Sequence, residues 1–286
     1  MTPMRILILA FVMAGFLSAC SPPYEDNPEL LFGDQVPTFE SYSIGNRTVH
    51  YAEAGNRNNG PILFLHGTPG SWAAFGYYLS DVRLSGRLNM VAVDRPGFGQ
   101  SDYGDLLPSL SEQSLVLKPL VDRLSYNCGV VLVGHSLGAP LAVRMAMDFP
   151  GKIAALVLVA PSLDPDLERP RWYNKVADYT VVSWLLPTEL VLANREVMAL
   201  PDELEKMLPF WNTLDLPITV IQGERDKLVH RDNADFAEKM VARGLRVVRL
   251  KEAGHFVLWK QPELIKNEIF YLLDNHLSKE PCFDSD

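Results

Sequence analysis

The chain has 286 residues, of which 48% are hydrophobic and 21% are charged, and its formal net charge is −9. This composition excludes a globally disordered chain and supplies enough apolar residues for one large core. The acidic balance and the lack of a block rich in Lys and Arg argue against nucleic acid, so we expect no nucleic-acid partner.

The first 20 residues are typical of an export signal. Arg5 precedes the uncharged apolar run 6–17, and small residues follow it. This run is too short to span a membrane, because a spanning helix needs about 20 residues. We therefore interpret residues 1–20 as a secretory signal peptide.

The end of this signal, Leu17-Ser18-Ala19-Cys20, resembles the lipobox of bacterial lipoproteins. The resemblance implies cleavage before Cys20, attachment of lipid to its thiol and fatty acyl chains such as palmitate as the membrane anchor. Ser21 at the next position implies the outer membrane, with the protein facing the periplasm. An ordinary signal that is cut near Ala19 is the alternative.

Residues 20–37 contain four prolines and several acidic residues, a composition that predicts an extended tether. The chain has three cysteines, which are too few for a disulfide framework and lack metal-ligand spacing. We expect Cys128 to be a small buried residue. Whether it pairs with Cys282 stays open, because sequence cannot place their Cα atoms.

The body of the chain alternates predicted strands and helices. Segments 39–44 and 48–54 flank Gly45-Asn46 and predict a hairpin. Nearly continuous apolar runs then predict buried strands at residues 62–65, 90–93, 130–133, 155–159, 218–221 and 247–250. Helical segments are expected at residues 111–124, 139–148, 232–242 and 262–277. This alternation predicts an α/β fold, with a mostly parallel sheet that helices cover on both faces.

One stretch, residues 162–211, is too long for a simple crossover between strands, and we interpret it as a short helical lid inserted over the strand ends. The lid divides the core into a first part, residues 38–161, and a second part, residues 212–279, and residues 280–286 form a tail. We expect most lid aromatic residues to pack the lid onto the body, and the others to govern substrate choice. They are Trp172, Tyr173, Tyr179, Trp184, Phe210 and Trp211.

The motif Gly134-His135-Ser136-Leu137-Gly138 matches G-x-S-x-G and lies between an apolar strand and a helical segment. A sharp turn at this point strains the serine backbone and exposes its hydroxyl at the start of a helix. The glycines on either side are needed because a Cβ would clash where strand and helix close together. We therefore predict that Ser136 is a nucleophile.

A serine hydroxyl becomes a good nucleophile only when a base removes its proton. His255 is the best-placed base, because it follows the last predicted strand. His135 should point away from the site if Ser136 points into it, and His66 should brace the neighbouring loop. The other three histidines lie in no motif and are expected to be structural or exposed: His50, His230 and His276.

The base needs an acid that fixes its tautomer and stabilises the imidazolium. Asp226 follows the strand at 218–221 and gives the chain order Ser, Asp, His, one of the orders in which serine triads occur. Glu224 lies closer to the strand and is a weaker candidate. Asp164, after the preceding strand, is the second candidate.

Acyl transfer also needs fixed donors for the negative oxygen of the intermediate. The N–H of Leu137, directly after the nucleophile, is the first predicted donor of this oxyanion hole. The second should come from His66-Gly67-Thr68-Pro69-Gly70. We assign it to Thr68, because Pro69 has no N–H.

These motifs, together with Asp94-Arg95-Pro96-Gly97-Phe98-Gly99-Gln100-Ser101, resemble the α/β-hydrolase fold superfamily over residues 38–279. The resemblance implies the triad Ser136, Asp226 and His255 and the oxyanion donors Thr68 and Leu137. It implies a structural role for the motif that begins at Asp94.

Within this superfamily, haloalkane dehalogenases and epoxide hydrolases use Asp where this chain has Ser136, which argues against both activities. Relatives that use serine include carboxylesterases, lipases, carbon–carbon bond hydrolases, proline aminopeptidases and cofactor-free haloperoxidases. Thr68 replaces the second glycine of the aminopeptidase motif and disfavours that class.

We expect a carboxylic ester hydrolase that forms an acyl-enzyme on a small-molecule acyl substrate and needs no metal or organic cofactor. Carbon–carbon or amide bond hydrolysis is the alternative within the fold. A catalytically silent binding lipoprotein is the alternative outside catalysis. The sequence does not indicate an oligomeric state.

Overall fold

The computed structural model describes residues 25–33, 35–278 and 282–283. The predicted signal peptide at residues 1–20 and the lipidation site Cys20 lie outside the described residues. So do most residues of the predicted tail. Within the described part of the chain, no helix combines the length and apolarity that a membrane span requires.

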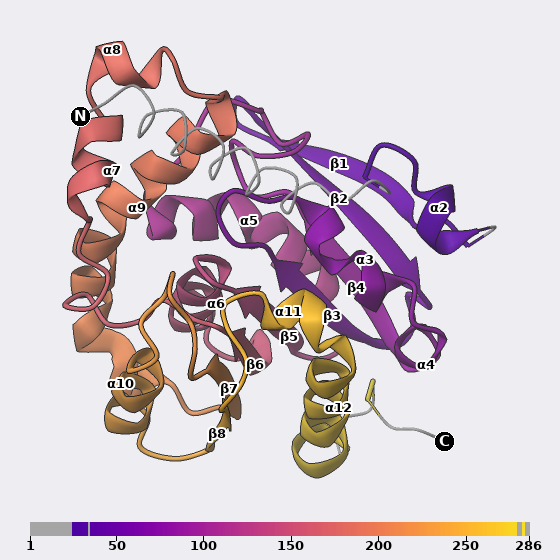
Figure 1. The fold of residues 1–286 in the computed structure, drawn as a ribbon. Coiled ribbons are helices and arrows are strands. Elements are labelled where there is room, and N and C mark those ends of the chain that lie inside the picture. The colour runs from indigo at the N-terminus through magenta and orange to yellow at the C-terminus, as the bar shows by residue number, and fades with distance from the viewer. Residues whose placement is uncertain (1–24, 34, 279–281, 284–286) are drawn as a thin grey trace.

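An eight-stranded sheet runs through the centre of the molecule (Figure 1). Its order is β1-β2-β4-β3-β5-β6-β7-β8, and the pairs β1–β2 and β2–β4 are antiparallel while the others are parallel. The strands are β1 (Thr38–Ile44), β2 (Arg47–Gly55), β3 (Gly60–Leu65), β4 (Leu88–Val93), β5 (Val130–His135), β6 (Ile153–Val159), β7 (Ile218–Gly223) and β8 (Leu245–Leu250). The predicted α/β class with a mostly parallel sheet is confirmed.

Helices cover both faces of this sheet, because successive residues of a strand point to opposite faces and both sets are apolar. One face packs against α5 (Leu110–Leu124), α6 (Gly138–Asp148) and α10 (Asn233–Met240). The other face packs against α2 (Glu29–Phe32), η1 (Trp72–Phe75), α3 (Gly76–Leu79), α4 (Val82–Ser85), α11 (Val257–Lys260), α12 (Pro262–Leu272) and η3 (Leu273–Leu277).

The sequence prediction differs from the fold in three respects. Within the predicted extended tether, residues 29–32 form the helix α2, and the buried Phe32 packs in the core beside Trp72. Strand 247–250 was expected to be buried, but β8 lies at one edge of the sheet and is partly exposed, because it has a neighbouring strand on one side only. The short helices between β3 and β4 were not predicted. They are too short for a helical repeat of apolar residues to be visible in the sequence.

The lid region contains three helices, α7 (Trp172–Ala177), α8 (Thr180–Ser183) and α9 (Thr188–Met207), followed by η2 (Leu208–Thr213). Figure 1 shows α7 and α8 beside the long helix α9, with α8 projecting at one end of the molecule. Asn174 of α7 and Asn194 of α9 exchange two hydrogen bonds of 3.0 Å, which hold the two helices together.

The motif that begins at Asp94 follows β4 and has a structural role in this fold. The buried carboxylate of Asp94 accepts hydrogen bonds from the N–H groups of Trp72 and Gln100, at 2.7 and 2.9 Å. His50 Nδ1 donates to the same carboxylate at 2.8 Å. These three contacts join β2, η1 and the turn after β4.

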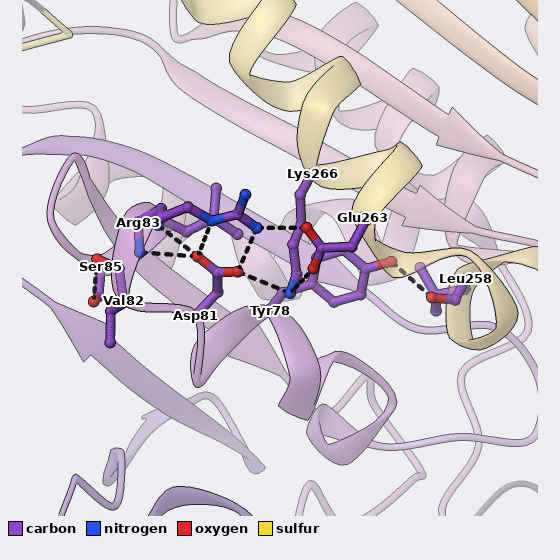
Figure 2. A network of polar contacts seen from close by, with 9 residues as sticks. Tyr78, Asp81, Val82, Arg83, Ser85, Leu258, Glu263 and Lys266 are labelled. Atoms are coloured by element: carbon purple, nitrogen blue, oxygen red, sulfur yellow. Dashed lines mark hydrogen bonds and ion pairs between the residues drawn. The ribbon is translucent and has the colours of Figure 1, made fainter.

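A network of polar side chains attaches α12 to α4 and the preceding loop (Figure 2). Lys266 of α12 is almost buried and donates to Asp81 at 2.9 Å and to Glu263 at 3.1 Å. Beside it, the Tyr78 hydroxyl donates to the carbonyl of Leu258 in α11 at 2.7 Å. Because α11 directly follows the loop of His255, this bond also limits the movement of that loop.

A disulfide bond joins Cys128, just before β5, to Cys282 near the C-terminus, with the Cα atoms 6.2 Å apart. Phe283 is buried beside it and packs against Gly60 at the start of β3. The pairing that the sequence left open is therefore present in the structure. It fastens the C-terminal segment to the amino ends of β3 and β5.

Candidate active site

Ser136 lies in the turn between β5 and α6, at the carboxyl edge of the parallel strands. Its backbone has a φ of 53°, in the left-handed region that non-glycine residues rarely occupy. The turn is held by bonds from Ser136 N–H to the Val159 carbonyl at 2.9 Å and from Ala139 N–H to the Ser136 carbonyl at 3.0 Å. The strain that the sequence motif predicted is therefore present.

Glycine is required on both sides of Ser136 because strand and helix approach closely. A Cβ on Gly134 would lie 2.4 Å from the carbonyl oxygen of Gly138. A Cβ on Gly138 would lie 2.2 Å from the carbonyl oxygen of Leu65 in β3. Any side chain at either position would displace α6 from the sheet.

His255 and Asp226 face each other from the loops after β8 and β7. His255 Nδ1 lies 2.8 Å from Asp226 Oδ2, and the Asp226 side chain is completely buried. The other oxygen, Oδ1, accepts the N–H groups of Leu228 and Val229 at 2.9 and 3.0 Å. Both carboxylate oxygens are thus fixed, and the Nδ1–H tautomer leaves Nε2 of His255 as the basic nitrogen.

The other carboxylates that the sequence offered have different partners. Asp164 Oδ1 accepts the N–H of Asp166 in a local turn at 2.9 Å. Glu224 lies beside Arg231 and Arg249, at 3.6 and 3.8 Å. Of the three candidate acids, Asp226 is the one paired with His255.

The expectation that His135 points away from the site is wrong. Its ring lies 5.0 Å from the ring of His255 and 5.0 Å from that of Trp259, measured between centroids. His135 Nε2 faces the carbonyl oxygen of His255 at 3.3 Å. Burial, with the nearby charge of His255, lowers the pKa of His135 to about 3. His135 is therefore a neutral support for the His255 loop.

The loop after β3 lies directly against the nucleophile turn. The approach is so close that a Cβ added to Gly67 would lie 3.0 Å from Ser136 Cβ. Thr68 is the next residue after Gly67 in this loop. The Thr68 Oγ1 atom is buried and has no hydrogen-bond partner among the described residues. Leu137 precedes α6, whose first N–H groups have no acceptor within the helix.

His66 braces this loop, as the sequence predicted. Its Nδ1 donates to the Gly67 carbonyl at 2.7 Å, and its Nε2 accepts the N–H of Arg95 at 2.9 Å. The ring is completely buried, and burial together with the Arg95 charge lowers its pKa well below the usual range. His66 is thus a neutral structural residue.

Arg95 connects the same loop to the lid. The sequence did not predict this role. The Arg95 side chain donates to the carbonyls of His66 and Gly67, at 2.8 and 2.9 Å. It also forms a two-pronged ion pair with Glu196 of α9, at 2.7 and 2.9 Å, and both side chains are almost completely buried. Gln113 of α5 contacts both charged groups at 3.0 Å.

Glu168 is a further carboxyl group near the site that the sequence analysis missed. Asn233 donates to it at 2.9 Å, and Ser162 is a second hydrogen-bond partner. Burial raises the pKa of Glu168, and the charges of His255 and Asp226 also act on it. The start of the lid therefore places an acidic side chain within electrostatic reach of the His255–Asp226 pair.

The expectation that most lid aromatics pack onto the body is wrong. Trp211 is buried, whereas Trp172 is 63% exposed and Trp184 is 83% exposed. The remaining lid aromatics are also exposed: Tyr173, Tyr179 and Phe210. The inner contacts of the lid are instead made by α9, which buries Leu192, Leu200 and Leu204.

In the described part of the chain, no group of three or more His, Cys, Asp and Glu side chains is arranged to hold a metal ion.

Comparison with known proteins identifies the family. A sequence profile described as "Alpha/beta hydrolase family" matches residues 62–267, and the chain belongs to this family. Human epoxide hydrolase 4 is 23% identical over 281 residues, covering 81% of this chain and 77% of the human protein. A haloalkane dehalogenase of Agrobacterium fabrum is 30% identical over 139 residues, which cover 49% of this chain and 44% of the dehalogenase.

Solved structures agree with this fold. A bacterial membrane phospholipase A superposes with a TM-score of 0.65 at 19% identity, over 94% of this chain and 96% of that chain. An epoxide hydrolase from Vigna radiata gives 0.66 at 18% identity, over 85% and 98%. At these identities the likeness establishes the fold alone.

The Arg95–Glu196 pair predicts a large loss of stability when one partner is removed. Glu196→Ala leaves a buried guanidinium without its counter-charge and should lower the free energy of unfolding by about 3–5 kcal/mol. Denaturant unfolding measures this loss. The control is Asp166→Ala, which removes the partner of Arg169 from a pair that is three-quarters exposed and should change stability little. Equal losses in the two variants would contradict the assignment.

His135 predicts loss of stability in acid. The pKa of His135 is about 3 in the folded chain, whereas an unperturbed histidine of the unfolded chain has a pKa of 6.5. The unfolded chain therefore binds the proton more readily than the folded chain. The contribution of neutral His135 to the free energy of unfolding is complete above pH 6.5 and is lost as the pH falls toward 3. This loss is at most about 5 kcal/mol. His135→Asn should flatten the fall in unfolding free energy between pH 7 and 4, measured with denaturant. An unchanged slope would show that His135 does not titrate in this way.

Proposed function

We propose that this protein is a serine hydrolase that cleaves a carboxylic ester, or a related small-molecule acyl substrate, through an acyl-enzyme. The observation that carries the proposal is the strained serine, Ser136, at the same sheet edge as the paired side chains of His255 and Asp226. Ser136 is the nucleophile, His255 the general base, and Asp226 the acid that orients it.

The proposed reaction has two halves. Ser136 Oγ attacks the acyl carbon while His255 Nε2 takes the hydroxyl proton, and the N–H groups of Leu137 and Thr68 stabilise the oxyanion. The intermediate then expels the alcohol, which leaves with the proton from His255. A water molecule, deprotonated by the same histidine, attacks the acyl carbon and releases the acid and Ser136.

The chemistry of serine argues against the activities named for several relatives. Attack of the Ser136 hydroxyl on an epoxide or haloalkane carbon would produce an ether. An ether has no carbonyl carbon for a His255-activated water to attack, so the enzyme would stay alkylated after one turnover. An acyl group on Ser136 keeps its carbonyl and can be hydrolysed.

Two alternatives remain. A carbon–carbon or amide bond hydrolase would form the same kind of acyl-enzyme, but its leaving group would be a carbanion or an amine instead of an alcohol. A binding protein without catalysis would have no need of a strained serine and a tethered His–Asp pair. Turnover of p-nitrophenyl esters of graded length, compared with the matching anilides, distinguishes the leaving groups.

The triad predicts a specific pattern of variant kinetics. Ser136→Ala and His255→Ala should each lower kcat for a p-nitrophenyl ester by about 10⁵-fold, and the double variant should be little worse, because the residues act as a unit. Asp226→Asn should cost about 10⁴-fold by disturbing the histidine tautomer.

The matched control for the acid is Asp164→Asn, which should retain most of the activity. If it proved worse than Asp226→Asn, the acid would be misassigned. If Ser136→Ala kept more than about a tenth of the activity, Ser136 would not be the nucleophile. Labelling by a fluorophosphonate should depend on Ser136 in the same way.

We also propose that the protein is lipid-anchored through Cys20 and faces the periplasm from the outer membrane. The sequence Leu17-Ser18-Ala19-Cys20 supports this proposal. The Cys128–Cys282 disulfide also supports export, because such bonds persist in oxidising compartments.

The anchor is tested in a Gram-negative host with a clickable fatty acid. The wild type should incorporate the label and fractionate with membranes, and Cys20→Ser should lose the label because it lacks the thiol. Cys128→Ser is the control for loss of a thiol elsewhere and should keep the label. An unlabelled wild type found free in the periplasm would leave only an ordinary signal peptide.

A further inference from the structure

An exposed apolar surface covers the outer side of the lid. Its members are Trp172, Tyr173, Val176, Tyr179, Trp184 and Leu185, each at least 41% exposed, and we call them the lid patch. Trp184 and Leu185 are 83% and 82% exposed. Large apolar side chains gathered on one surface segment mark an interaction site more often than single ones do.

The α7 part of the lid patch is held in place because α7 is fastened to the long lid helix α9. Asn174, between the patch residues of α7, bonds to Asn194 of α9. The rings of Trp172 and Tyr173 contact each other edge to face, with centroids 5.9 Å apart. Figure 1 shows that α8, which immediately precedes Trp184, projects beyond the rest of the molecule.

Exposed basic residues outnumber acidic ones on the segment that carries the lid patch, in contrast to the chain as a whole. Arg171 and Lys175 are exposed on the same segment, against the single acidic residue Asp178. Exposed Lys227 lies beside them, because Arg171 donates to its carbonyl at 3.2 Å. A patch rimmed by these cations, on a chain of net charge −9, complements an anionic surface.

The contact between Arg171 and Lys227 also places the lid patch beside the candidate active site. Lys227 is the residue after Asp226, which pairs with His255. A surface that covers the lid patch would therefore lie next to the loop of the proposed catalytic acid.

We propose that the lid patch docks on the surface of a phospholipid bilayer that contains anionic lipids, and that the enzyme takes its acyl ester from that surface. Trp and Tyr rings have an apolar body and a polar edge, so they favour the headgroup level of a membrane. Basic residues at the rim add attraction to anionic headgroups. The choice of substrate rests on the proposed serine hydrolase function, whereas the docking does not.

The docking is tested with the full chain, purified in detergent and reconstituted into vesicles of phosphatidylethanolamine and phosphatidylglycerol with a brominated phosphatidylcholine. Of the five tryptophans, Trp172 and Trp184 are well exposed while Trp72 and Trp211 are buried. Bromine should quench the wild-type emission, and Trp172→Phe combined with Trp184→Phe should lose most of the quenched component. Ser136→Ala should be quenched like the wild type, which separates docking from catalysis.

The consequence for catalysis is tested with two esters. Trp184→Ser combined with Leu185→Ser should lower turnover of a long-chain ester carried in the vesicles at least about tenfold, because two large apolar side chains no longer enter the surface. Turnover of a dissolved p-nitrophenyl acetate should stay within about twofold, which also shows that the variant is folded. Tyr126→Ser is the matched control, since Tyr126 is 87% exposed but precedes β5, at the amino end of that strand.

Three results would overturn the proposal. The first is an absence of quenching in the wild type. The second is an equal loss of vesicle-borne turnover in the Tyr126→Ser control. The third is a wild type that sediments as a dimer in detergent while the Trp184→Ser, Leu185→Ser variant is monomeric, because the lid patch would then bind a second copy of the chain. If Ser136→Ala hydrolysed both esters while quenching persisted, the proposed nucleophile would fail and the docking would stand.

Discussion

The buried side chain of Arg95 is the point at which three parts of the structure meet. A guanidinium has five N–H donors, and here all five have acceptors: two backbone carbonyls of the loop after β3, the amide oxygen of Gln113 and both carboxylate oxygens of Glu196. A charge removed from water is tolerated only with such complete pairing. Since each acceptor comes from a fixed direction, the loop, α5 and α9 have little freedom to move relative to one another.

The site is linked to this constraint because the loop after β3, which Arg95 holds, lies against the strained turn. Ser136 occupies a left-handed backbone conformation, and a Cβ added to Gly67 in the loop after β3 would lie only 3.0 Å from Ser136 Cβ. Arg95 holds that loop from its other side by the carbonyls of His66 and Gly67. Buried polar contacts of the neighbouring loop therefore add to the backbone bonds of the turn in supporting the strained serine, as is common at functional sites.

Sequence patterns predicted the class of fold and the main strands, because a buried parallel strand is a short run of apolar residues. They also selected Asp226 and His255, since both follow such runs directly. Glu196 was missed because its partner lies 101 residues away, which no local pattern reports. One signal was present in the sequence. Glu196 lies four residues from both Leu192 and Leu200, so it is on the same buried face of α9, where an apolar residue is expected. His135 was misjudged because the direction of a side chain at a strained turn depends on tertiary packing.

The lid helix α9 buries Leu192, Leu200 and Leu204 as an ordinary amphipathic helix does, but the lid also has polar residues inside and apolar residues outside. Its inner side buries Asn194, Glu196 and Glu203, while Trp184 and Leu185 face outward. Burying polar groups inside and exposing large apolar ones outside raises the free energy of a lid that is surrounded by water alone. The inner groups are satisfied, since Glu196 bonds to Arg95 and Glu203 accepts the N–H of Leu110. The outer residues have no such compensation within the described chain, so the lid is better matched to a place between the protein body and a second, apolar surface than to water.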